Sequence, residues 1–137
     1  MIFPAMMAAI ALMQGGWTWT LYEDDPLVLA NEIPDTPQLR AVLECEPGSG
    51  VARVDLYDPR PGSAGIATII SGSATATGES EVAADHRSVA LRTDHPVFGQ
   101  FVLTGGLDVA VGDRTQALKV ETAHLAKLQR FAELCGG

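Results

Sequence analysis

Two Asp-His pairs are the first candidates for chemistry in this sequence, because aspartate and histidine together can bind a metal ion or move protons. They are Asp85–His86 and Asp94–His95, nine residues apart. The segment between them, residues 87–93, alternates as one β-strand does, and a strand rises roughly 3.3 Å per residue. The pairs should therefore lie about 30 Å apart, at opposite ends of that strand. We interpret them as turn residues rather than as one metal site.

The other candidates for catalysis or cofactor binding are weak. His124 has Glu121 one helical turn before it, but no further ligand stands one turn later. The short glycine-containing loops lack the lysine and hydroxyl residues of a phosphate-binding loop, and no G-x-S-x-G nucleophile motif occurs. We therefore expect a protein that is not an enzyme and that has no metal or cofactor site.

Cys45 and Cys135 are the only cysteines of the chain. Cys45 falls on the inward face of an expected strand, and Cys135 on the inward face of an expected C-terminal helix, so packing of the helix on the sheet would bring the two sulfurs together. A bond between them would close a loop of about 90 residues and add roughly 4–5 kcal/mol of stability. We predict this disulfide, and two buried free cysteines are the alternative.

Aromatic and acidic residues near the start of the chain suggest a surface for a partner. In the stretch WTWTLY, Trp17 and Trp19 share one face of an expected strand. They either anchor that strand in the core or form an exposed aromatic ledge. The following acidic run lacks the spacing of a calcium loop and suits a solvated turn. The residues that we take as a possible partner surface are Trp17, Tyr22, Glu23, Asp24, Asp25 and Tyr57.

Composition limits the class of partner. The chain has 137 residues, 47% of them hydrophobic, which is enough for the core of a single domain. Its 17 acidic and 9 basic residues give a net charge of -8. Such a chain repels phosphate backbones, so we expect no nucleic-acid partner.

The N-terminus resembles an export signal. The apolar run from Ile2 to Met13 is too short to span a bilayer, which needs roughly 20 residues, but it suits the core of a secretory signal. We predict that residues 1–16 are a signal peptide or an apolar N-terminal segment, and that residues 17–137 form a single globular domain. The mature chain should then lack a transmembrane span and be periplasmic or secreted. The alternative is a buried N-terminal element of a cytoplasmic domain.

Apolar periodicity predicts mostly strands. Residues 39–57 form the clearest hairpin, and Gly72 is expected to be a bulge or kink within one long strand. A short helix is expected at residues 96–103, with a strand as its rival, and a longer helix over 121–134 that Thr122 could cap. The expected strands are 17–22, 27–30, 39–45, 51–57, 66–78, 87–93, 107–112 and 116–120.

These elements predict an α+β fold. We expect an antiparallel β-sheet or flattened β-sandwich of about seven or eight strands, covered by the C-terminal α-helix and held by one disulfide. The residues expected in the core are Trp19, Leu43, Val54, Leu56, Ile69, Leu91, Phe98, Val109, Leu125, Leu128 and Phe131.

The function that the sequence favours is binding. We expect a small exported, non-catalytic binding or structural module of the bacterial cell envelope, whose partner is another envelope protein. The alternative is an acidic inhibitor or immunity-type factor that uses its acidic turn to bind a basic enzyme.

Overall fold

The computed structural model describes residues 16–137. Its elements, in chain order, are β1 (Thr18–Glu23), β2 (Leu27–Glu32), β3 (Leu39–Cys45), β4 (Val51–Tyr57), β5 (Gly65–Ser71), β6 (Ala74–Val82), β7 (His86–Arg92), α2 (Pro96–Thr104), β8 (Gly106–Val111), β9 (Arg114–Lys119), a 3₁₀ turn (Thr122–His124) and α3 (Leu125–Gly136).

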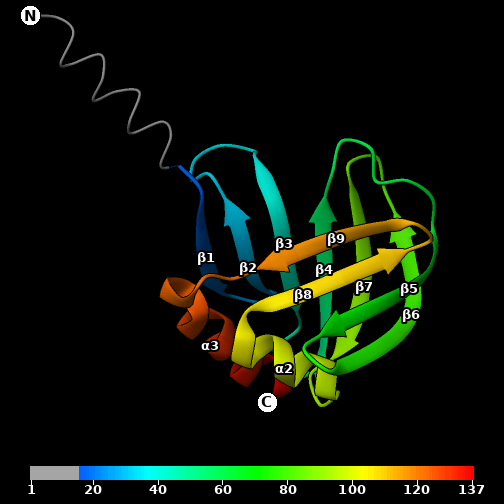
Figure 1. The fold of residues 1–137 in the computed structure, drawn as a ribbon. Helices are drawn as coiled ribbons and strands as arrows, with labels where there is room; N and C mark the ends of the chain where they lie inside the picture. Colours follow the sequence, from blue (N-terminus) through cyan, green and yellow to red (C-terminus); the bar gives the residue numbers. More distant parts are fainter. Residues whose placement is uncertain (1–15) are drawn as a thin grey trace, which may run out of the picture.

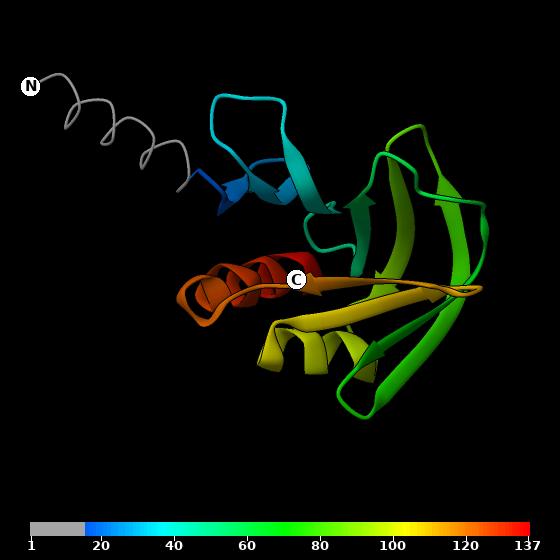
Figure 2. The ribbon, with the colours of Figure 1, turned by 45° about the horizontal axis from the view of Figure 1, so that its top comes forward.

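The strands form one antiparallel sheet in the order β1-β2-β3-β4-β7-β6-β5-β8-β9. The sheet curls into a half-barrel, so that β8 and β9 pass in front of β3 and β4 in Figure 1. Figure 2, in which the top of the molecule is turned toward the viewer, shows the same curl. The α+β prediction is confirmed, and the single curled sheet takes the place of the flattened sandwich that was the other expectation. The curl brings together strands that are far apart in sheet order, which matters for the cleft described below.

The sheet has nine strands rather than seven or eight, because the expected strand 66–78 is two strands. Gly72 has φ +57°, in the left-handed region, and starts a two-residue turn after which Ala74 pairs with Ser71. A bulge and a tight hairpin both favour glycine, so the sequence signal was the same for each.

Helix α2 lies against β5, β6 and β8 of the sheet, and α3 against β1, β2 and β4. The helix expected at 96–103 is confirmed as α2, and the His95 ring caps it by accepting a hydrogen bond from the Val97 N–H at 3.1 Å. At its other end Gly105 has φ +79°, and a Cβ there would lie 2.1 Å from the Val120 carbonyl oxygen. Only glycine permits this close approach between the end of α2 and the chain after β9.

The C-terminal helix is confirmed, but its start was wrongly predicted. Thr122 begins the 3₁₀ turn instead of capping the helix, and α3 starts at Leu125 with no side-chain cap. The helix buries Leu128 and Phe131 fully, whereas Leu125 is only partly buried. Every other residue expected in the core is buried.

The disulfide between Cys45 and Cys135 is present, and it joins the end of β3 to the last turn of α3. Backbone hydrogen bonds support the same junction, because Gly48 N–H donates to the Leu134 oxygen at 3.0 Å and Gly50 N–H to the Cys135 oxygen at 2.8 Å. Among residues 16–137, no helix combines the length and apolar character needed to cross a membrane. The predicted signal segment lies outside the described residues, except for Gly16.

Candidate binding cleft

A cleft lies where the curled sheet brings β9 opposite β1–β4. Its volume is about 340 Å³. Strands from both halves of the sheet contribute to it, so the cleft exists only because the sheet curls. The residues that line it are Trp19, Asn31, Arg40, Ala41, Leu56, Tyr57, Gln116, Ala117, Leu118, Lys119 and Glu121.

Much of the floor of the cleft is one cross-strand row. Trp19 is opposite Asn31, Asn31 opposite Ala41, and Ala41 opposite Leu56, so the row crosses β1 to β4 in register. All four side chains are buried. Facing residues of an antiparallel pair lie on the same side of the sheet, and this side is the inner one. Ala41 is the smallest member, and its short side chain leaves room in the middle of the row.

Two buried polar atoms of the floor have no partner. Trp19 is 1% exposed and Asn31 is 9% exposed, yet neither the Trp19 Nε1–H nor the Asn31 Oδ1 makes a hydrogen bond within the described part of the chain. A buried unpartnered donor or acceptor costs about 1–3 kcal/mol. Both residues line the cleft, where a ligand group or an ordered water would supply the missing partner.

The rim of the cleft is polar and carries two cations. The Arg40 guanidinium lies 4.0 Å from the centre of the Trp17 ring, a cation–π contact that holds it beside the opening. Lys119 stands on the exposed side of β9. Glu121 is the one acidic residue among those that line the cleft, so the rim is net positive on a chain of charge -8.

Tyr57 adds a neutral donor to this rim. Burial, and next the carboxylate of Asp55, raise the pKa of Tyr57 above its ordinary value. The phenol is therefore protonated at neutral pH and can donate a hydrogen bond. Its ring also lies against His86, with 4.9 Å between the ring centres.

A buried cation continues the floor row onto β7. Arg87 faces Leu56 and is 3% exposed. Its guanidinium donates to the Ser80 Oγ at 2.6 Å and to the carbonyl oxygens of Pro61 and Ser63 at 2.7 and 2.8 Å. Burial, and then the nearby Arg114, lower the pKa of Arg87 from its ordinary value. Arg87 thus holds the loop between β4 and β5 against the sheet.

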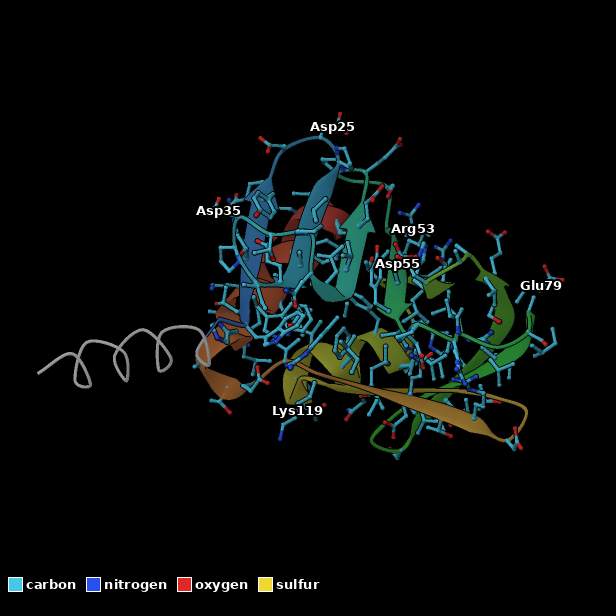
Figure 3. All side chains as sticks on the ribbon, turned by 90° about the horizontal axis from the view of Figure 1, so that it is seen from above. Asp25, Asp35, Arg53, Asp55, Glu79 and Lys119 are labelled. Carbon is cyan, nitrogen blue, oxygen red and sulfur yellow. A yellow bond between two sulfur atoms is a disulfide. The ribbon has the colours of Figure 1, made fainter. Side chains whose placement is uncertain are left out.

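The possible partner surface predicted from the sequence is divided between two ends of the sheet. Trp17 is partly buried under Arg40, and Tyr57 lines the cleft, so these two residues lie at the same end. Glu23, Asp24 and Asp25 are exposed around the β1–β2 turn at the opposite end. Figure 3 shows Asp25 and Lys119 at opposite sides of the molecule.

Tyr22 lies beside the acidic turn, but its hydroxyl reaches along the sheet and donates to Glu32, at the other end of β2, at 2.5 Å. Within the turn, Glu23 pairs with Arg130 of α3 at 3.2 Å. Trp19 lies in the core, as one of the two sequence interpretations expected, and does not form an exposed ledge.

Asn31 of the cleft was not identified from the sequence, and neither was Arg87, which is next in the same row on β7 but does not line the cleft. The expected strand 27–30 stops before Asn31, although Asn31 continues the inward alternation of Leu27 and Leu29. Arg87 shares the inward alternation of Val89 and Leu91. Strand alternation is thus the signal that could have found both.

The three histidines lie outside the cleft. His86 contacts Asp85 at 2.9 Å, His95 caps α2, and His124 lies 3.2 Å from the Lys127 ammonium. Over residues 16–137, no three His, Cys, Asp or Glu side chains gather closely enough to hold a metal ion.

Comparison with known proteins gave no matching protein family, no matching curated protein and no matching solved structure.

Proposed function

We propose that this protein is an exported, non-catalytic binding module that receives its partner, another protein of the cell envelope, in the cleft between β9 and β1–β4. The observation that carries this proposal is that one cleft is lined by two residues with a buried polar atom, and by two cations, for which residues 16–137 supply no hydrogen-bonding or acidic partner. Ligand sites combine an apolar floor with a few convergent polar groups in this way.

The disulfide supports the proposed location. Disulfides form and persist in oxidising compartments such as the periplasm or the extracellular space. The bond between Cys45 and Cys135 is buried in the junction of β3 and α3, so it has a structural role there. An oxidising compartment agrees with the export signal that the sequence predicts.

An acidic inhibitor remains the second candidate function. It predicts a basic partner, whereas binding at the cleft predicts an acidic one. Asp24 and Asp25 are exposed at the end of the sheet away from the cleft. A partner held there would be basic, whereas a partner held at the net positive rim of the cleft would be acidic. Variants at the two ends therefore separate the two functions.

The test is capture of partners from an envelope extract by immobilised, oxidised protein. Ala41→Leu fills the middle of the floor row and should abolish capture by the cleft. Ala90→Leu makes the same change on an exposed position of β7 and should capture as the wild type does. Asp24→Asn with Asp25→Asn should also leave capture unchanged. Loss of capture in the acidic-turn variant but not in Ala41→Leu would overturn the cleft as the binding site.

A further inference from the structure

The free edge of β9 offers backbone hydrogen-bonding groups. β9 is the last strand of the sheet, and within residues 16–137 it pairs with β8 alone. The Val120 N–H donates to the Gly105 oxygen at 2.7 Å, which fixes the phase of the ladder. Hydrogen-bonded and non-hydrogen-bonded pairs alternate along an antiparallel ladder. The N–H and C=O groups of Thr115, Ala117 and Lys119 therefore point away from β8.

The other edge of the sheet, β1, is contacted by side chains of α3. The Lys127 ammonium of α3 donates to the Trp19 carbonyl oxygen at 2.5 Å, and Arg130 of the same helix pairs with Glu23. The helix thus places two long side chains on β1. β9 pairs with β8 without a register shift and contains no proline. Its charged residues, Arg114 and Lys119, stand at its two ends, so the outward backbone groups of Thr115 and Ala117 between them are open to an added strand.

This free edge borders the cleft. Residues 116–119 of β9 line it together with the floor row. A strand added beside β9 would cover the opening and send alternate side chains toward Leu56 and Leu118. Extended peptides bind in this way, with affinity from backbone hydrogen bonds and specificity from pockets for alternate side chains.

The basic residues at the cleft indicate the charge of the added strand. All nine basic residues lie within the described part of the chain. Four form ion pairs with carboxylates, and Arg87 and Lys127 hydrogen-bond to neutral groups. The three that do neither are Arg40, Arg60 and Lys119, and two of these, Arg40 and Lys119, line the cleft. An acidic side chain on the added strand would pair with them.

We infer that the cleft binds an extended acidic segment of the partner, which pairs with the free edge of β9 as an additional strand. Apolar side chains of the segment alternate into the cleft, and its carboxylates meet Arg40 and Lys119. This inference rests on the proposed function and names the chemistry of its partner.

The probe is a displayed library of random seven-residue peptides, selected on oxidised wild-type protein. The selected peptides should alternate apolar residues and carry Asp or Glu. Ala117→Pro removes one outward N–H and leaves the β8 ladder intact, because proline is tolerated on edge strands. This variant should bind the selected peptides with about tenfold lower affinity, as expected for a lost hydrogen bond. Ala117→Val keeps the N–H and should bind like the wild type.

A second measurement keeps the test independent of the folding of that variant. Synthetic copies of the selected peptide carry N-methyl groups on one or the other set of alternate amides. Methylation of one set should abolish binding to the wild type, and methylation of the other should leave it unchanged. Arg40→Gln with Lys119→Gln should weaken binding about tenfold or more at low salt, whereas Arg60→Gln, which removes a charge away from the cleft, should not.

The inference is overturned if no peptide is selected or if the selected peptides are basic. It is also overturned if neither Ala117→Pro nor either methylation pattern lowers the affinity of the peptides. Partner capture by the two variants tests the proposed function separately. Partner capture that is lost in Ala41→Leu but complete in Ala117→Pro leaves the binding module standing without strand addition. Complete capture by both variants overturns both.

Discussion

Trp19 and Asn31 face each other across β1 and β2, and each buries one polar atom that the other does not satisfy. The indole N–H is a donor and the amide Oδ1 an acceptor, so the pair contains complementary groups that make no hydrogen bond in the described chain. A structure selected for stability alone would have an apolar residue at position 31. If no water or ligand satisfies it, the amide lowers the stability of the free protein, and the variants below measure this.

Asn31→Leu should therefore stabilise the protein. Replacing the unpartnered amide by an apolar side chain of similar size should raise the free energy of unfolding by about 1–3 kcal/mol. Urea denaturation measures this as a higher midpoint with an unchanged slope. Asn31→Asp is the control, because a buried carboxylate at the same place should lower the midpoint. A lower midpoint for Asn31→Leu would show that the amide already has a partner.

Tyr57 should keep its proton well above neutral pH. Burial and the Asp55 carboxylate raise its pKa in the folded chain above the unfolded value of about 10. Its contribution to stability is thus fully present below that unfolded pKa and is lost as pH rises through the folded pKa. In Tyr22→Phe, Tyr57 is the only tyrosine, and the ultraviolet absorbance of tyrosinate should report a midpoint above that of free tyrosine.

Circular dichroism through the same titration shows whether the chain stays folded. A midpoint at or below that of free tyrosine in a folded chain would contradict the buried setting of the phenol. In Tyr57→Phe, the loss of stability that begins at high pH should be smaller than in the wild type.

The sequence predicted the local elements well, because their signals are local. Alternation in residues 39–57 identified β3 and β4, and proline with helical spacing identified α2. The hairpin at Gly72 was missed since β-branched residues continue on both sides of it, as they would through a bulge. The same alternation placed Cys45 on the face that α3 covers, which is why the disulfide could be predicted.

The cleft could not be predicted in the same way. Its floor depends on the register that aligns Trp19, Asn31, Ala41 and Leu56, and its far wall is β9, which approaches them through the curl of the whole sheet. Register across four strands and sheet curvature are tertiary properties that no single segment encodes. Only the inward position of Asn31 was open to sequence reasoning.

Arg87→Met should release the loop between β4 and β5. The variant keeps much of the apolar stem but leaves Ser80 Oγ and the carbonyl oxygens of Pro61 and Ser63 without their donor. Hydrogen bonds to charged groups contribute about 1.5–3 kcal/mol, so the loop should open more often. Amide hydrogen exchange in residues 62–64 of this loop should then be faster than in the wild type.

Arg114→Gln is the comparison for that experiment. It removes the exposed ion pair between Arg114 and Asp58 at 3.1 Å, which contributes little, and should change the hydrogen exchange of residues 62–64 much less. Equal rates for the wild type and Arg87→Met would show that Arg87 does not hold the loop.

Breaking the disulfide should lower stability without undocking α3. The bond joins residues separated by 90 positions, and closing a loop of that length contributes roughly 4–5 kcal/mol. Cys135→Ser, or reductant added to the wild type, should lower the melting temperature by on the order of 10 °C or more. Leu128 and Phe131 remain buried, and Gly48 and Gly50 still donate to the end of α3, so far-ultraviolet circular dichroism should keep its helical signal. Reductant should change nothing further in Cys135→Ser. If the reduced wild type melts at the oxidised temperature, the hydrogen bonds and packing at this junction alone hold the helix, and the bond stabilises nothing.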